Sequence, residues 1–320
     1  MHGIGMFDKP GVFYSKDPTI IFDNKWLLDY SKIESLKQHD FVVLDFASEH
    51  YGVDGLDYIY HALSAEGVNF ILLSHEPADH QKFKRMFFYP HWCNHARKML
   101  KIPELNNLSV RSYKWGCLNG NSRPHRIYNY IYSQQQTYFN SACFTMHCEP
   151  EDVSTRGDDV ILDSNVVAEW DKIKINLTTK LFPSGSDCIC DLPANIDAYI
   201  HLVTETTVIP RIFLSEKTWK PIACEQIFLL FGNPGSIQHL RDLGVDVFDD
   251  LIDHSYDNET DWKNRCHLIH KQIENLVSLD LHDVYINTQQ RRSANREKFF
   301  AGDFDQPYYQ LITQCINMQS

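Results

Sequence analysis

The sequence contains no apolar run that could cross a membrane. Its longest apolar runs, such as residues 227–231, are far shorter than the roughly 20 residues that span a bilayer. The first residues also lack the basic start and the apolar stretch of a secretory signal. We therefore expect a cytoplasmic protein without a membrane partner.

Positive charge is scarce in this chain. Lys and Arg total 30 against 42 Asp and Glu, which gives a net charge of −12 with histidine neutral. Proteins that hold nucleic acid by neutralising its backbone normally have an excess of basic residues. The balance argues against a protein coated in positive charge, but it leaves room for a few cations in one cleft.

Cysteine spacing gives neither a disulfide frame nor a metal motif. The nine cysteines are an odd number, and Cys188 and Cys190 stand too close for a Cys-x-x-Cys pair. His91 and His95 would share one face of a helix, but they have no carboxylate companion. The sequence therefore predicts reduced thiols and no metal site.

Length and composition predict two globular domains. The 320 residues are about twice the length of one typical domain. With 43% hydrophobic and 22% charged residues, the chain can bury a sizeable core.

The first half of the chain contains a strand–helix–strand pattern. Residues 41–46 and 69–74 are compact apolar runs, typical of buried parallel strands. Between them, apolar residues from Leu56 to Leu63 recur at helical spacing. This order predicts a βαβ unit and hence a parallel sheet.

The expected domain boundary is the stretch 149–157, which is acidic, contains Pro150 and has no apolar periodicity. We predict an N-terminal domain over residues 1–150 and a C-terminal domain over residues 151–320. The last helix could cross back to the N-terminal domain.

The second half repeats the α/β pattern. Residues 198–203 and 227–231 are strand-like, and helices are expected from Ser236 and from about residue 261. The fold class predicted for the chain is α/β, with ligands bound where the strands' carboxyl ends face a cleft.

The most informative stretch is 201–232. A strand ends at Thr204-Glu205, and after a loop Ser215 is followed by a short helix. The start of a helix suits a phosphate, and Lys217 adds a full positive charge there. Glu216 could accept hydrogen bonds from ribose or sugar hydroxyls. The alternative is a Ser-capped helix with ordinary surface charges.

This stretch resembles the signature of the C-terminal lobe in glycosyltransferases of the α1,3-fucosyltransferase type, which have the GT-B fold. That signature has an apolar strand ending in Glu, then (Thr/Ser)-Glu-Lys, then an apolar strand ending in Gly; the matching residues are 202–205, 215–217 and 228–232. The resemblance implies two Rossmann-like domains with a cleft between them. It also implies a nucleoside-diphosphate-sugar donor, with Glu205, Ser215, Glu216 and Lys217 in the donor site and Lys217 on the diphosphate.

Residues 118–126 resemble a second feature of the same family, an Asn-rich loop followed by an arginine that binds donor phosphates. The resemblance implies a donor role for Asn119 and for one arginine, with Arg126 the first choice and Arg123 the second. The alternative for Arg126 is a surface arginine on an amphipathic helix.

A general base would complete an inverting transfer by taking the proton of the acceptor hydroxyl. Residues 73–77 resemble a Glu-containing segment of the family, and Glu76 fits that position. Asp45 and Glu49 are alternatives, and His75 could serve if its pKa were near neutral.

The chain also departs from the fucosyltransferase pattern. The loop before Ser215 lacks the usual glycines and carries Pro210-Arg211, so fucose is not assigned as the sugar. Residues 240–244 and 253–257 resemble glycosyltransferase-like proteins of large tailed phages. That likeness implies that Tyr256 lies near the donor. The alternative is that Tyr256 is a packed tyrosine in a turn.

The expected activity is a metal-independent transfer of a hexose or pentose from a nucleotide-sugar donor to a hydroxyl. Cations would stabilise the leaving diphosphate, so no cofactor is expected beyond this co-substrate. The phage resemblance implies a hydroxymethylated base in phage DNA as the acceptor, which would make the activity a DNA modification. The alternative is a non-catalytic α/β phage protein that binds a partner or a nucleotide.

Overall fold

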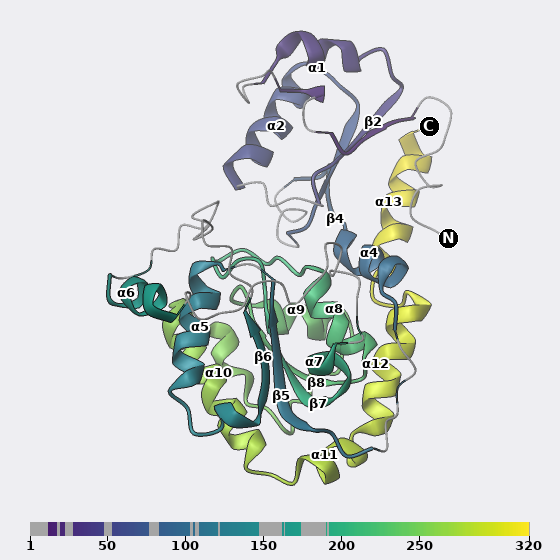
Figure 1. Ribbon diagram of the computed structural model, residues 1–320. Coiled ribbons are helices and arrows are strands. Elements are labelled where there is room, and N and C mark those ends of the chain that lie inside the picture. The colour runs from purple at the N-terminus through teal and green to yellow at the C-terminus, as the bar shows by residue number, and fades with distance from the viewer. Residues whose placement is uncertain are drawn as a thin grey trace. The chain divides into compact units, whose positions relative to one another are not determined.

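The structure of the chain is a computed structural model (Figure 1). It describes residues 12–17, 20–22, 28–47, 53–76, 83–102, 105, 109–120, 122–146, 162, 164–173, 190 and 192–319. The chain divides into two compact units: unit 1 comprises Met1–Asn94 and Asp305–Ser320, and unit 2 comprises His95–Phe304. Each unit contains a parallel sheet of four strands, so the fold is α/β and compatible with two Rossmann-like domains.

Unit 1 contains a sheet of order β1-β2-β3-β4. Its strands are β1 (Val12–Ser15), β2 (Phe41–Asp45), β3 (Phe70–Ser74) and β4 (Met86–Phe88). Its helices are α1 (Tyr30–Leu36), α2 (Val53–Ala65) and α13 (Gln306–Gln319), while α4 (His91–Met99) runs from unit 1 into unit 2. The predicted βαβ unit is therefore confirmed as β2-α2-β3.

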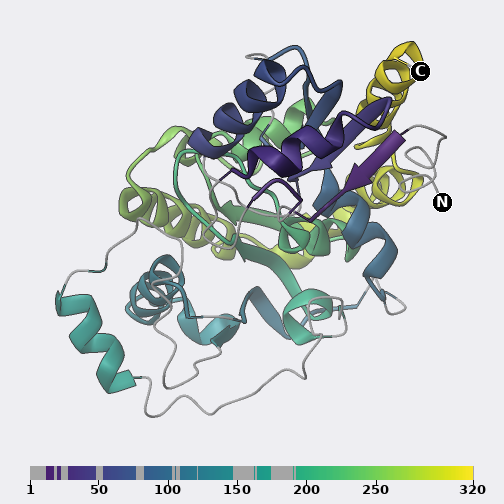
Figure 2. The same ribbon diagram turned by 90° about the horizontal axis from the view of Figure 1, so that it is seen from above.

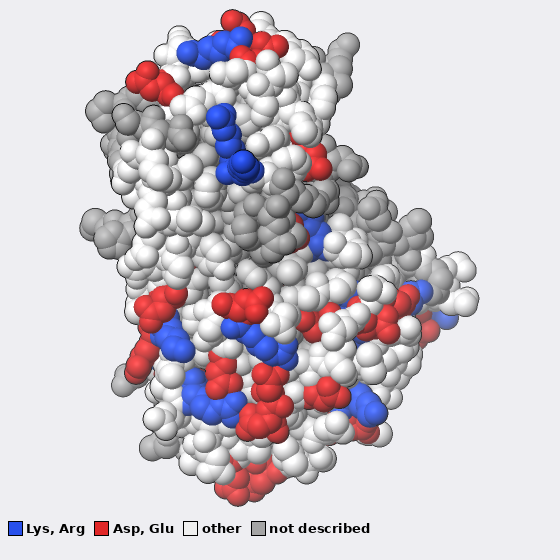
Figure 3. Space-filling view, turned by 180° about the vertical axis from the view of Figure 1, so that it is seen from behind, with Lys and Arg blue, Asp and Glu red and all other residues white. Residues whose placement is uncertain are grey.

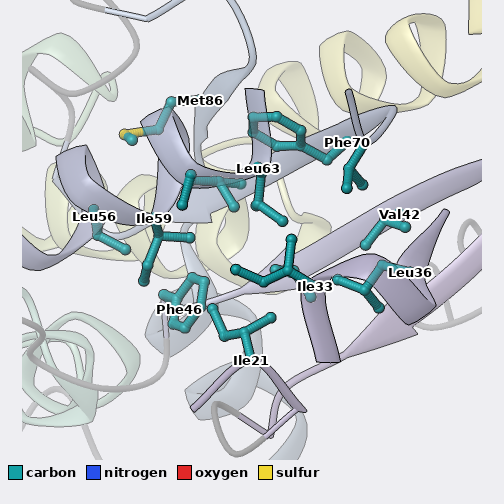
Figure 4. Packing of buried hydrophobic residues seen from close by; sticks show 14 residues of the cluster. Ile21, Ile33, Leu36, Val42, Phe46, Leu56, Ile59, Leu63, Phe70 and Met86 are labelled. Carbon is teal, nitrogen blue, oxygen red and sulfur yellow. The ribbon is translucent and has the colours of Figure 1, made fainter. Parts of the chain in front are cut away.

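The core of unit 1 lies on both faces of its sheet. Val42 and Leu44 pack with residues of α1 and α2 on one face, as Figure 4 shows for this cluster. Phe41 and Val43 point to the other face, where they pack with Ile312 of α13. Alternate side chains of β2 thus enter two different hydrophobic clusters. Burial on both faces explains why β2 and β3 are continuous apolar runs in the sequence.

Unit 2 contains a sheet of order β6-β5-β7-β8. Its strands are β5 (Tyr113–Asn119), β6 (Ala142–Met146), β7 (Ala198–Thr204) and β8 (Ile227–Phe231). Because β5 pairs with β7, the segment from β5 to β6 belongs to the second sheet. The predicted boundary near residue 150 therefore does not match the division after Asn94. The stretch 149–157 itself lies outside the described residues.

Helices cover both faces of the unit 2 sheet. They are α5 (Pro124–Gln134), η2 (Phe139–Ser141), α6 (Ser164–Ile173), α7 (Pro193–Ile196), α8 (Glu216–Ala223), α9 (Ser236–Asp242), η5 (His254–Asn258), α10 (Trp262–Val277), α11 (Leu281–Asn287) and α12 (Gln289–Ala301). In both views α10 and α12 lie on opposite sides of the strands (Figures 1 and 2). Helix α5 packs on α10, and α8 packs on α12. No helix in the described ranges is long and apolar enough to span a bilayer.

Close packing of α7 on β5 depends on Gly116. A Cβ atom at this position would lie 2.7 Å from Ala194 Cβ and 2.9 Å from Ala194 Cα. We expect Gly116→Ala to lower the free energy of unfolding by about 1–3 kcal/mol, because the backbone of α7 must move to admit the methyl group. Urea unfolding measures this loss.

Gly120→Ala is the matched control, because a Cβ atom there meets nothing within 4 Å. We expect it to leave the unfolding free energy within about 0.5 kcal/mol of the parent. Equal losses in the two variants would contradict the packing account.

Candidate functional site

The strand order of unit 2 changes direction between β5 and β7. The chain passes from β5 through α5 to β6 on one side, and from β7 through α8 to β8 on the other. Parallel sheets bind ligands at such a point, outside the carboxyl ends of the strands. Of the predicted donor residues, Asn119 ends β5 and Glu205 directly follows β7. Arg126 lies in the first turn of α5, the helix after β5.

Glu205 follows β7 and is completely buried. Its Oε1 accepts hydrogen bonds from Ser215 N at 3.0 Å and from Thr218 Oγ1 at 2.5 Å. Its Oε2 accepts from Ser215 Oγ at 2.6 Å and from Thr206 N at 3.1 Å. The carboxylate thus fastens the start of α8 to the end of β7, and we assign it a positioning role.

Gly232, which directly follows β8, leaves room for the side chain of Glu205 because it has no Cβ atom. A Cβ atom on Gly232 would lie 3.3 Å from both Cβ and Cγ of Glu205. The signature residues at the ends of β7 and β8 are therefore linked by direct packing. Thr218 was not singled out in the sequence, although it directly follows the Ser-Glu-Lys motif.

Ser215 is the N-cap of α8, as the sequence predicts. Its Oγ donates to Glu205 and accepts from Lys217 N at 3.3 Å. One hydroxyl thus satisfies a backbone N–H of the first turn and the buried carboxylate.

Lys217 and Glu216 form an ion pair in the first turn of α8. Lys217 Nζ donates to Glu216 Oε1 at 2.7 Å and lies 3.3 Å from Ser215 Oγ. Burial would raise the pKa of Glu216, but the charge and hydrogen bond of Lys217, with the charge of Lys220, hold that pKa below its usual value. The side chain of Lys217 remains 27% exposed.

Arg123 and Arg126 lie at the start of α5. Arg123 is the N-cap, no side chain caps this helix, and Pro124 is its first residue. Arg126 is buried, and its Nη2 donates to Thr204 O at 3.1 Å and to Glu205 O at 3.0 Å. Burial and the charge of Arg123 lower the pKa of Arg126 to about 10, so it stays protonated at neutral pH. Arg123 keeps partial exposure.

His125 is a buried residue of the site that the sequence pattern does not reveal. Its Nε2 lies 2.9 Å from Glu205 O, so this nitrogen carries the proton and donates. Burial, with the charges of Arg126 and Arg123, holds the pKa of His125 well below its usual value, and the ring is neutral. Its Nδ1 has no hydrogen-bond partner within the described part of the chain.

Asn119 joins three strands. It ends β5, and its Nδ2 donates to Thr145 O of β6 at 3.2 Å. Its Oδ1 accepts from Thr204 Oγ1 of β7 at 2.6 Å. The side chain is completely buried. Asn119 therefore holds the strand ends in place, and we assign it a positioning role as well.

Arg265 brings α10 to the same edge of the sheet. Its Nη1 donates to Gly232 O at 2.6 Å, and its Nη2 donates to Val208 O at 3.0 Å. Burial lowers the pKa of this arginine to about 10. No motif marked this residue in the sequence.

Tyr256 lies in η5 and is completely buried. Its hydroxyl is 2.9 Å from His254 Nδ1 and 3.5 Å from Leu230 N. The next residue, Asp257, accepts hydrogen bonds from the first turn of α9. This arrangement fits the turn with a packed tyrosine and does not bring Tyr256 to the donor residues.

The two candidate bases lie in unit 1, after adjacent parallel strands. Asp45 ends β2 and Glu76 follows β3, so both stand at the carboxyl edge of that sheet. Asp45 Oδ2 accepts from Tyr14 OH at 2.7 Å, and Oδ1 accepts from Ala47 N at 3.0 Å. Burial raises the pKa of Asp45 despite these bonds. Glu76 is also buried, with its backbone N on Ser74 Oγ; Glu49 lies outside the described residues.

Among the residues that the structure describes, no three His, Cys, Asp or Glu side chains are grouped to hold a metal ion. His91 and His95 both lie on α4. The charged groups at the carboxyl edge of the unit 2 sheet are arginine, lysine and paired carboxylates.

The link between Ser215 and Glu205 can be tested by stability. We expect Ser215→Ala to lower the free energy of unfolding by about 2–4 kcal/mol, because it removes both an N-cap and a charge-assisted hydrogen bond. Denaturant unfolding measures the loss.

Ser236→Ala is the matched control, since Ser236 is an equally buried serine at the start of α9. Its Oγ has no hydrogen-bond partner among the described residues, so we expect no loss. A Ser215→Ala variant as stable as this control would refute the role given to the Glu205 network.

Comparison with known proteins adds no assignment to this site. No protein-family model, no curated protein and no solved structure matches the chain significantly. The chemistry of the site therefore rests on the contacts of its own residues.

Proposed function

We propose that the chain is a glycosyltransferase of the GT-B type, which transfers a hexose or pentose from a nucleoside-diphosphate sugar to a hydroxyl. One observation carries this proposal: two helices, each with cations in its first turn, begin at the carboxyl ends of the adjacent strands β5 and β7. Such an edge suits a diphosphate, because helix N-termini and cations both attract negative charge. Two α/β units with parallel sheets support the GT-B assignment.

The partial exposure of two cations decides which residues bind the diphosphate. Lys217 and Arg123 are partly exposed, whereas Arg126 is buried and donates to backbone carbonyls. We therefore assign direct phosphate contacts to Lys217 and Arg123. Arg126 would stabilise the diphosphate through its charge, without a direct contact. A diphosphate would also relieve the repulsion between Arg123 and Arg126.

Catalysis follows from charge stabilisation and proton transfer. As the sugar leaves the diphosphate, negative charge grows on the phosphate oxygens, and Lys217 and Arg123 stabilise it. In an inverting transfer, a carboxylate takes the proton of the acceptor hydroxyl. We assign the base to Glu76, the buried carboxylate that follows β3 and that the family resemblance indicates.

For the acceptor we propose a hydroxymethylated base of phage DNA. Several surface cations of unit 2 are engaged by acids: Arg241 pairs with Asp249, and Arg291 pairs with Asp246. Figure 3 shows one face of the molecule on which Lys and Arg are likewise mixed with Asp and Glu. DNA would therefore be held at a local group of cations rather than on a broad basic surface.

Donor binding tests the role of Lys217. We expect one of the UDP-, GDP- and dTDP-sugars to raise the melting temperature of the parent protein. At a concentration of 100 times Kd, binding should raise the free energy of unfolding by about 2.7 kcal/mol. Lys217→Ala should lose about tenfold or more in donor affinity, because a charge-assisted hydrogen bond contributes about 1.5–3 kcal/mol. Calorimetric titration gives the affinity.

Lys298→Ala is the control, since Lys298 is an exposed lysine of α12 in the same unit. It should bind the donor like the parent. Unchanged binding and turnover in Lys217→Ala would refute the proposal, and no shift with any nucleotide sugar would favour a non-catalytic α/β protein.

The assignment of the base is tested by Glu76→Gln. We expect this variant to bind the donor normally but to lose at least about 100-fold in transfer to hydroxymethylated DNA, since general-base catalysis contributes about 10²–10⁴-fold. Asp45→Asn should keep most of the transfer rate.

Asp45→Asn should instead change how stability depends on pH. Burial raises the pKa of Asp45, so the folded state binds its proton more tightly than the unfolded state does. The parent therefore loses stability as the pH rises above the ordinary carboxyl pKa of about 4, and Asp45→Asn removes this loss.

Loss of transfer in Asp45→Asn and not in Glu76→Gln would reverse the assignment of the general base.

A further inference from the structure

Four aromatic side chains gather where α5 and α10 meet, and we call them the aromatic cluster: Tyr128, Tyr132, Trp262 and His267. The ring of Tyr132 stacks on that of His267, with centroids 4.4 Å apart. Tyr128 and Tyr132 are parallel within 5°, and Trp262 meets Tyr128 edge to face at 5.1 Å. Tyr128 OH lies 2.7 Å from His267 Nε2, which fixes the two rings relative to each other.

The aromatic cluster is only partly buried. Large aromatic rings that serve the core of unit 2, such as Trp115 and Trp219, are almost completely buried instead. The Lys263 ammonium lies 5.7 Å from the ring centre of Tyr128 and 5.5 Å from that of Trp262. Partly exposed rings beside a cation are the combination that binds planar, conjugated groups of anionic ligands.

The place of the cluster connects it to the candidate phosphate site. Tyr128 lies little more than one turn after Arg123, the N-cap of α5, and helical side chains lean toward the N-terminus of their helix. Trp262 is the first residue of α10, and Arg265 in the same turn is fastened to Gly232 O and Val208 O. Tyr128 and Trp262 therefore lie within about two helical turns of residues at the carboxyl edge of the sheet, Arg123 and Arg265.

We propose that the aromatic cluster binds the nucleobase of the donor nucleotide. This inference rests on the proposed function, since it places the base beside the diphosphate of the same ligand. A nucleobase fits better than a sugar ring or a peptide for two reasons. Its flat π-system stacks on parallel rings, and its carbonyl oxygens can accept a hydrogen bond from the Lys263 ammonium.

The test compares probes with and without a base. Calorimetric titration gives the affinities of UDP, GDP, dTDP and ADP, and of pyrophosphate alone, for the parent and for Trp262→Ala. We expect the parent to bind at least one nucleoside diphosphate more tightly than pyrophosphate. Trp262→Ala should weaken that nucleotide about 5- to 150-fold and leave pyrophosphate unchanged, because stacking acts on the base alone.

Two further variants make the result specific. Trp262→Leu keeps apolar volume without a π-face, so it should fold normally and show the same selective loss. Tyr113→Ala, at a partly exposed tyrosine that begins β5, should affect neither probe. Equal losses for nucleotide and pyrophosphate, or equal losses in Trp262→Ala and Tyr113→Ala, would overturn the inference.

Failure of the inference is distinguishable from failure of the proposed function. If the parent binds neither nucleotides nor pyrophosphate, both are refuted. If Trp262→Ala keeps the affinity for UDP or GDP and loses only that for the corresponding nucleotide sugar, the cluster holds the sugar. That result refutes a base site and leaves the transferase proposal standing.

Discussion

The buried carboxylate of Glu205 is the constraint on which the second unit depends. A charge without contact to water is costly unless hydrogen bonds satisfy it, and four donors do so here. Those donors come from Thr206, Ser215 and Thr218, so the loop after β7 must return to the strand end before α8 begins. The geometry of α8 is thereby set by a residue that comes before the loop.

The main chain of Glu205 carries the constraint across to α5. Its carbonyl oxygen accepts hydrogen bonds from His125 and Arg126, while its carboxylate holds Ser215. One residue thus couples the starts of two helices that belong to different crossovers of the sheet. We infer two layers in the site: a buried layer that fixes geometry, and a partly exposed layer that contains Arg123 and Lys217.

The sequence reveals strands that are continuous apolar runs more readily than strands that contain polar residues. Strands β2, β3 and β8 are uninterrupted apolar runs, and Ser215 is a plain N-cap, so each was predictable. Strand β5 reads Tyr-Lys-Trp-Gly-Cys-Leu-Asn, and its polar residues hide it. Its pairing with β7 joins residues far apart in the sequence, which local patterns do not encode. The domain boundary was misplaced for that reason.

For the site residues, the sequence indicates the type of residue but not the orientation of its side chain. Residue types and motif spacing indicate Lys217, Glu216 and the arginines. They do not tell whether a side chain turns inward, and that depends on helix phase and on distant carbonyls. Arg126 and Tyr256 are buried for this reason, and Arg123 is left partly exposed. His125 and Arg265 escape notice because their partners are backbone oxygens of other elements.

Backbone carbonyls also explain how an acidic chain can keep a cationic site. Arg126 donates to Thr204 O and Glu205 O, and Arg265 donates to Gly232 O and Val208 O. Carbonyl oxygens satisfy these donors without cancelling their charge, whereas a carboxylate partner would cancel it. The pKa of each guanidinium falls to about 10, which still leaves it charged at neutral pH. The net charge of −12 therefore says little about this edge, where buried arginines keep their charge beside the carboxylates of Glu205 and Glu216.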